Sequence, residues 1–330
     1  MVMATGIVSL AARLQGLGSV AWLLFGLNIV AWLVFCALSV LRLARFPGRM
    51  LADLADHLRG PGFFTTVAGT AVLGSQFAIF DLSRPVAAAL GALAGALWLL
   101  LTYAIFTALT IKEDKPSLNR GINGGWLLAV VATQSLAVLG ALLAAREPQP
   151  WKLELNYFAL SMWLWGGMLY IWMISLIFYR YTFFAFAAGD LTPPYWINMG
   201  AMAISTLAGS LLIVNAPDAP FLEALLPFVK GFTVLYWATG TWWIPMLLVL
   251  AVWRYVYKRF PLRYDPMYWG AVFPLGMYSA ATHEMTEALG LGFLGAVAPA
   301  FFYAALAAWT AAFIGLVRNL PRRQRALRLD

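Results

Sequence analysis

Charged residues are scarce in this chain. Asp, Glu, Lys and Arg make up 11% of its 330 residues, whereas 62% are hydrophobic. Soluble globular domains carry about 25% charged residues, so the composition excludes that class. The net charge of +8 does not indicate a nucleic-acid partner, because the basic residues lie at the ends of apolar segments, where they set topology and meet lipid head groups. The sequence predicts a multi-pass membrane protein.

Cysteine and histidine are almost absent. The single cysteine, Cys36, allows no internal disulfide and no cysteine-based metal site. The segment DLADH, with Asp53, Asp56 and His57, offers one carboxylate pair without the second acidic cluster that a magnesium-diphosphate enzyme needs, and is interpreted as a solvated loop. There is also no Ser-His-Asp set, P-loop or GxGxxG motif in a fitting context. We therefore predict no enzyme activity, catalytic residue, metal or cofactor.

Long linkers and low-complexity segments are missing as well. Ten apolar runs follow one another with short connections, at residues 1–14, 18–43, 61–80, 85–111, 121–145, 153–182, 194–216, 222–256, 266–287 and 291–317. The first run is only about 21 Å long as a helix, less than a hydrocarbon layer of about 30 Å, which suggests a truncated first helix. A signal peptide is the alternative, but Arg13 follows the apolar run instead of preceding it. We predict one membrane domain over residues 1–330, with a basic cytoplasmic tail at 318–330.

Lys and Arg are distributed unevenly between the two ends of the predicted spans. Most of the 22 basic residues lie in loops after even-numbered spans or in the C-terminal segment. The loops after odd-numbered spans contain Arg13, Arg84, Arg146 and Lys152. Because cytoplasmic loops are enriched in basic residues, we expect both termini to be cytoplasmic, in the cell membrane.

The spans alternate in character along the chain. Odd-numbered spans are rich in small and hydroxylated residues, as in TTVAGTAVLGSQ, whereas even-numbered spans are bulky and aromatic, as in MWLWGGMLYIWMISLIFYRY. This pattern indicates a fivefold internal repeat in which one helix of each pair faces an axis and the other faces lipid. The predicted fold is an all-α membrane protein with ten transmembrane helices, arranged as five helical hairpins around a central pore.

Small residues recur every third or fourth position on the odd-numbered spans, which places them on one face of each helix. The predicted pore-lining residues are Thr5, Ser9, Thr66, Thr70, Gly125, Thr133, Ser205, Gly209 and Gly276. Hydroxyl donors can replace the hydration of an anion without holding it too tightly. The alternative is that these residues only allow close helix packing, with hydroxyls bonded back to their own helix.

The ninth span carries an aromatic residue, a proline and a glycine at its centre. Pro274 removes a backbone donor and introduces a kink, and Gly276 removes a side chain beside the Phe273 ring. We interpret Phe273 as a gate in the path; a core-filling aromatic is the alternative. Near the end of this span His283 and Glu284 offer a proton-linked site, or alternatively a hydrated helix end.

Five stretches of the odd-numbered spans together resemble a known family. They are VMATGIVSLAA, GFFTTVAGTAVLGSQ, INGGWLLAVVATQSLAVLG, PPYWINMGAMAIS and YWGAVFPLGMYSAAT. The chain is similar to the tellurite-resistance and dicarboxylate transporter family, whose relatives include plant slow anion channels, yeast malate permeases and fungal sulfite efflux pumps. The resemblance implies five helical hairpins, a homotrimer with one path per subunit, and an occluding aromatic before the proline, at Phe273. Family members carry a longer segment before the first motif, and several kink their inner helices with proline where this chain has glycine.

The predicted function is transport of small anions or C4-dicarboxylates through the central pore, with the lipid bilayer as surroundings and no nucleic-acid partner. The alternative is a proton-coupled dicarboxylate or sulfite exporter of the same fold. A membrane enzyme or a purely structural protein is a third possibility with little support in the residues. The identity of the anion is left open.

Overall fold

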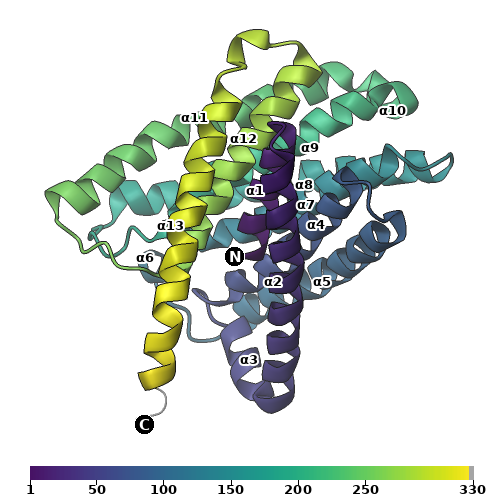
Figure 1. The fold of residues 1–330 in the computed structure, drawn as a ribbon. Helices are drawn as coiled ribbons and strands as arrows, with labels where there is room; N and C mark the ends of the chain where they lie inside the picture. The colour runs from purple at the N-terminus through teal and green to yellow at the C-terminus, as the bar shows by residue number, and fades with distance from the viewer. Residues whose placement is uncertain (327–330) are drawn as a thin grey trace.

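The computed structural model describes residues 1–326, with side chains up to residue 319. Within this part the chain forms helices and no strand, and eight helices are long and apolar enough to cross a membrane (Figure 1). The shorter apolar helix α1 and the 21-residue helix α12 pack among them. The predicted all-α membrane fold is confirmed.

Five helices form the inside of the bundle. They are α1 (Val2–Leu14), α4 (Phe64–Ile79), α7 (Leu128–Ala144), α9 (Ile197–Asn215) and α12 (Trp269–Leu289). In α7 and α9 the apolar stretches are 89% buried. These are the helices with small and hydroxylated residues, so the predicted inner set is the buried one.

Five longer helices surround the inner set. They are α2 (Gly18–Arg45), α5 (Arg84–Ile111), α8 (Trp151–Phe183), α11 (Leu226–Val252) and α13 (Val297–Ala326). Only 22% of the apolar stretch is buried in α2, α11 and α13. Their remaining bulky side chains are exposed on the outside of the bundle, as expected for a surface that faces lipid.

The inner helices close into a ring. Each packs against the next in chain order, and α12 packs against α1, while α13 lies along α1 (Figure 1). Glycine permits the close approach: a Cβ on Gly276 would lie 3.1 Å from Ile7 Cγ2, and one on Gly200 would lie 2.7 Å from Pro274 Cγ. Small residues are the usual means by which membrane helices approach closely.

Four of the inner helices begin with a 3₁₀ turn that sequence reasoning did not separate from the helix. The turns are η1 (Gly60–Phe63), η2 (Gly124–Leu127), η3 (Pro193–Trp196) and η6 (Pro266–Tyr268). Each starts at glycine or proline and contains an aromatic residue, and successive turns contact one another. They therefore form a collar at one end of the ring.

The remaining elements are short and were not predicted. They are α3 (Pro47–Leu54), α6 (Leu118–Gly121), α10 (Pro220–Ala224), η4 (Ala216–Asp218), the π turn η5 (Trp253–Tyr257) and η7 (Gly292–Leu294). The segment predicted as a tail at 318–330 is helical up to Ala326, because α13 continues to that residue. Residues 327–330 of this predicted tail, including Arg328, lie outside the described residues.

A tryptophan on each outer helix donates an indole hydrogen bond to an inner helix, which is the next one in the chain for the first four outer helices and α1 for α13. The bonds are Trp32 to Thr70 Oγ1 (3.0 Å), Trp98 to Thr133 Oγ1 (2.8 Å), Trp163 to the Ser205 carbonyl (2.8 Å), Trp237 to Thr282 Oγ1 (3.0 Å) and Trp309 to Thr5 Oγ1 (3.0 Å). The last bond joins α13 to α1 and completes the cycle. The same type of contact between an outer and an inner helix therefore occurs five times, once for each outer helix.

We expect Trp98→Phe to lower the free energy of unfolding by about 0.5–1.5 kcal/mol, because Thr133 loses its indole donor while most of the apolar ring is kept. Thermal or denaturant unfolding in detergent measures the change. Trp151→Phe is the control, since Trp151 is 60% exposed and makes no indole bond to the described residues. Equal effects of the two substitutions would show that the hydrogen bond contributes nothing.

Candidate functional site

Phe273 lies on α12 inside the ring of inner helices and is 0% exposed. Two residues close to it on α12 contact the neighbouring inner helices. Pro274 packs against Gly200 of α9, and Gly276 packs against Ile7 and Val8 of α1. Phe273 thus lies between the two contacts that join α12 to its neighbours in the ring.

The side of α12 that contacts the outer helices carries other residues. Tyr278 shares a 2.7 Å hydrogen bond with Thr241 of α11, Ser279 donates to the Ala298 carbonyl of α13 at 2.7 Å, and Thr282 accepts the indole bond from α11. At about 100° per residue these three positions lie roughly 140–240° around the helix from Phe273. The Phe273 ring therefore projects from the opposite face, toward the interior of the ring.

Three of the predicted pore-lining hydroxyls are directed to the outer helices. Thr5, Thr70 and Thr133 each accept an indole hydrogen bond, and Thr133 also donates to the Ala129 carbonyl at 2.9 Å. These contacts give the hydroxyls a role in holding inner and outer helices together. Pore lining by these residues stays a prediction.

The other predicted hydroxyls bond to backbone carbonyls. Ser9 donates to Ala21 of α2 at 2.7 Å, and Ser205 donates to Ala201 of its own helix at 2.8 Å. Thr66 is exposed and donates to Phe63 at 2.7 Å. Their hydroxyl protons are engaged, and only oxygen lone pairs remain for other contacts.

The predicted pore-lining glycines occupy three different settings. Gly125 donates its backbone N–H to Asn123 Oδ1 at 2.7 Å, at the start of the 3₁₀ turn before α7. A Cβ on Gly209 would overlap the Thr233 hydroxyl of α11 and lie 3.1 Å from the Trp163 ring of α8. Gly276 faces α1, as described above. Two of the three glycines therefore mark close helix contacts.

The candidate proton-linked residues lie near the C-terminal end of α12. His283 and Glu284 are both half-buried there, and Glu287 is exposed one turn later. Within the described residues no group of three or more His, Cys, Asp or Glu side chains is arranged to hold a metal ion. A role of His283 and Glu284 in proton coupling stays a prediction.

The DLADH segment is tied to the protein by its own carboxylates. Asp53 forms ion pairs with Arg42 and, at 2.7 Å, with Arg59. Asp56 Oδ1 accepts from the backbone N–H groups of Leu58 and Arg59 at 2.9 Å. Both carboxylates therefore stabilise the turn between α3 and η1.

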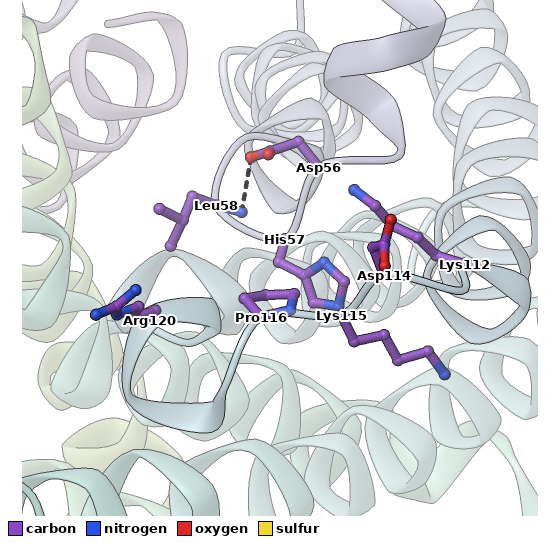
Figure 2. A pocket seen from close by; sticks show the side chains of 8 residues that line it. All are labelled: Asp56, His57, Leu58, Lys112, Asp114, Lys115, Pro116 and Arg120. Atoms are coloured by element: carbon purple, nitrogen blue, oxygen red, sulfur yellow. Dashed lines mark hydrogen bonds between the residues drawn. The ribbon is translucent and has the colours of Figure 1, made fainter.

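A pocket of about 370 Å³ lies between this turn and the segment after α5. Figure 2 shows its lining of Asp56, His57, Leu58, Lys112, Asp114, Lys115, Pro116 and Arg120. Burial, aided by the Lys112 ammonium, lowers the pKa of His57 below its usual range, so the imidazole is neutral near pH 7. The ring lies 6.3 Å from that of Trp126 in η2, next to the collar.

Sequence reasoning treated the two loops of this pocket separately and missed their contact. Lys112 joins them directly, because its Nζ donates to the Ala55 carbonyl at 3.1 Å. Both loops follow even-numbered spans and carry basic residues, which is the signal that places them at the same end of the bundle.

Comparison with known proteins identifies the family. Residues 1–317 match the SLAC1 family, described as "Voltage-dependent anion channel". An uncharacterized membrane protein of Mycobacterium tuberculosis is 39% identical over 152 residues, which cover 46% of this chain and 77% of the relative. An uncharacterized transporter of Methanocaldococcus jannaschii is 26% identical over 260 residues, covering 78% of this chain and 72% of the relative, and a second is 27% identical over 252 residues, covering 74% and 68%. The chain therefore belongs to the SLAC1 family, the family of the C4-dicarboxylate and tellurite-resistance transporters that its odd-numbered spans resemble.

Proposed function

We propose that this protein passes small anions or C4-dicarboxylates across the membrane through the interior of the inner ring, and that Phe273 closes the path. The observation that carries the proposal is the fully buried Phe273 ring on the face of α12 opposite its contacts with the outer helices. A phenyl ring in a narrow bore blocks ions by its volume and by dewetting the constriction. Membership of an anion-channel family supports the choice of substrate.

The ring interior has the electrostatic character that anion passage requires. The inner helices α4, α7 and α9 contain no Asp, Glu, Lys or Arg. Along these three helices an anion meets no carboxylate that repels it and no fixed cation that retains it, so its hydration is replaced by backbone and hydroxyl dipoles. The cationic side chains Lys112, Lys115 and Arg120 gather instead at the pocket beside the collar.

A proton-coupled exporter of the same fold is the second candidate. It is favoured by the half-buried His283 and Glu284, which are the ionisable pair on the helix that carries Phe273. In this mechanism the pair takes up and releases protons with each transported anion. Collapse of the proton gradient by a protonophore stops such transport and leaves a channel conducting.

We further propose that the protein lies in the cell membrane as a homotrimer with one path per subunit and with both termini in the cytoplasm. The distribution of Lys and Arg supports the orientation. The exposed apolar faces of the outer helices provide surface for both lipid and neighbouring subunits.

The transport assignment is tested with the purified chain in liposomes. We expect flux of one or more of chloride, nitrate, sulfite and malate that follows the anion gradient without a pH gradient. Liposomes that contain the protein but show no flux of any of the four, with Phe273→Ala equally silent, would contradict the proposed function.

We expect Phe273→Ala to increase anion flux, because loss of the ring widens and hydrates the constriction. Phe273→Leu increases flux less, and Phe273→Trp leaves the path closed. A residue that only fills the core would instead cost about 3–5 kcal/mol of stability on truncation to alanine. Flux and thermal unfolding are measured on the same preparations, and an unstable, impermeable Phe273→Ala protein would exclude the gate.

Thr133→Val separates the two roles of the hydroxyls, since valine keeps the shape and removes the acceptor of the Trp98 indole bond. We expect a loss of about 0.5–1.5 kcal/mol in unfolding free energy with an unchanged order of anion preference. A changed preference with unchanged stability would instead place this hydroxyl on the path.

Cysteine accessibility in intact cells tests the orientation. On a Cys36→Ala background, single cysteines placed between residues 42 and 59 should resist an impermeant external reagent and react after the membrane is opened. External labelling of this loop would reverse the orientation.

A further inference from the structure

A smaller cavity of about 130 Å³ lies at the collar end of the bundle, between the start of α9, the end of α11 and the start of α12. Six of its lining residues carry the argument: Thr192, Tyr195, Arg254, Tyr255, Tyr268 and Ala271. Arg254 belongs to the π turn η5, which directly follows the outer helix α11. Phe273 is not among the residues that line this cavity.

Arg254 is buried, and its guanidinium has no polar partner among the described residues. It is 7% exposed, its Nε is fully buried without a hydrogen bond, and its guanidinium forms no ion pair with the described residues. Its protein contacts are aromatic, since its guanidinium carbon lies 4.2 Å from the centre of the Phe260 ring and 5.1 Å from that of Tyr255. Asp265, just before η6, uses its Oδ1 to accept from the Met267 N–H at 2.7 Å. A buried charge in this state is strongly unfavourable unless something pairs with it.

A second buried arginine of the same chain provides the contrast. Arg180 is 8% exposed and donates to the Ile122 carbonyl at 2.9 Å and to the Tyr195 hydroxyl. It also lies 3.9 Å from the Asp190 carboxylate. Its Nε is buried without a partner, as in Arg254, so the contrast lies in the terminal guanidinium nitrogens. The fold therefore supplies partners to one buried guanidinium and leaves the other facing a cavity.

The rest of the cavity lining also offers donors. Thr192 Oγ1 is buried and has no hydrogen-bond partner in the part of the chain that the structure describes. The hydroxyls of Tyr255 and Tyr268 lie 2.8 Å apart, so one donates to the other and the second keeps its proton for another acceptor. No carboxylate lines the cavity. The volume accommodates several waters or one tetrahedral oxyanion, and it is too small for a nucleotide.

We propose that this cavity binds a phosphate-type oxyanion, either inorganic phosphate or the phosphodiester of a lipid head group, with the Arg254 guanidinium as its counter-ion. Arginine suits this chemistry because its planar donors match phosphate oxygens. The occupant contacts three helices at once, and Ala271 of the lining lies two residues before Phe273 on α12. Binding therefore braces the start of the helix that carries Phe273.

The test uses the full chain in detergent after delipidation. Thermal unfolding is followed during titration with sodium phosphate, against sodium chloride at equal ionic strength, and in a second arm with phosphatidylglycerol against the phosphate-free lipid monoolein. We expect one or both phosphate ligands to raise the Tm of the parent protein. A response to phosphatidylglycerol alone assigns the site to lipid, and a response to inorganic phosphate assigns it to the free anion.

Three variants tie the response to the cavity. Arg254→Gln should weaken the apparent affinity about tenfold or more, and Thr192→Val several-fold, because each removes a donor to the oxyanion. The matched control Arg263→Gln, at an exposed arginine of the same end, should respond like the parent. Equal responses of Arg254→Gln and Arg263→Gln in both arms, or no response of the parent to either ligand, would overturn the proposal.

The ligand-free proteins distinguish a binding site from a structural contact. If Arg254 serves a ligand, its replacement by glutamine removes an unpaired buried charge, and the Tm without phosphate stays equal or rises. If Arg254 serves only to stack on Phe260, the Tm falls and the response to phosphate is kept, which contradicts the proposal. Should Arg254→Gln fail to fold, an unweakened response in Thr192→Val is the contradicting result.

Discussion

In the hydrocarbon layer no water is present to satisfy a polar group, so each indole N–H and each hydroxyl must find its partner within the chain. The five indole hydrogen bonds meet this requirement for one tryptophan of each outer helix. Such a bond is directional, and it therefore fixes the rotation of an inner helix about its own axis as well as its position. The orientation of Phe273 depends on it, because the Trp237 bond holds Thr282 on the outer side of α12 and leaves the Phe273 face toward the ring interior.

Much of this architecture is predictable from composition and periodicity. Apolar runs long enough to cross a bilayer define the helices, and the alternation of small with bulky residues separates inner from outer ones, because only small side chains allow the inner helices to approach. Composition and periodicity do not predict which neighbouring helix is contacted by the face of each inner helix that carries the small residues. The spacing of Thr66 and Thr70 predicts a common face for them. The hydrogen-bond partner of Thr70 is however Trp32, 38 residues earlier, and the spacing of residues along one helix carries no information about such a distant donor.

The basic residues illustrate a second limit. Counting Lys and Arg by loop indicates orientation, yet the count treats Arg180, Arg254 and Arg263 alike. In the folded chain the first is buried and paired, the second is buried beside a cavity, and the third is exposed. The difference arises from the segment after α11, where the π turn and the Phe260 ring enclose Arg254. A single π turn inside an apolar run leaves no recognisable sequence signal.

The bond between Trp309 and Thr5 joins residues 304 positions apart, so the first and last membrane helices meet in the finished ring. During synthesis α1 enters the membrane with one of its two flanks uncovered, and it stays so until α13 has been inserted. Four of the five indole bonds can form progressively as each hairpin follows the last, whereas the fifth requires the complete set of helices. A nascent chain interrupted before Trp309 therefore presents an open edge beside α1, where the Thr5 hydroxyl lacks its indole donor.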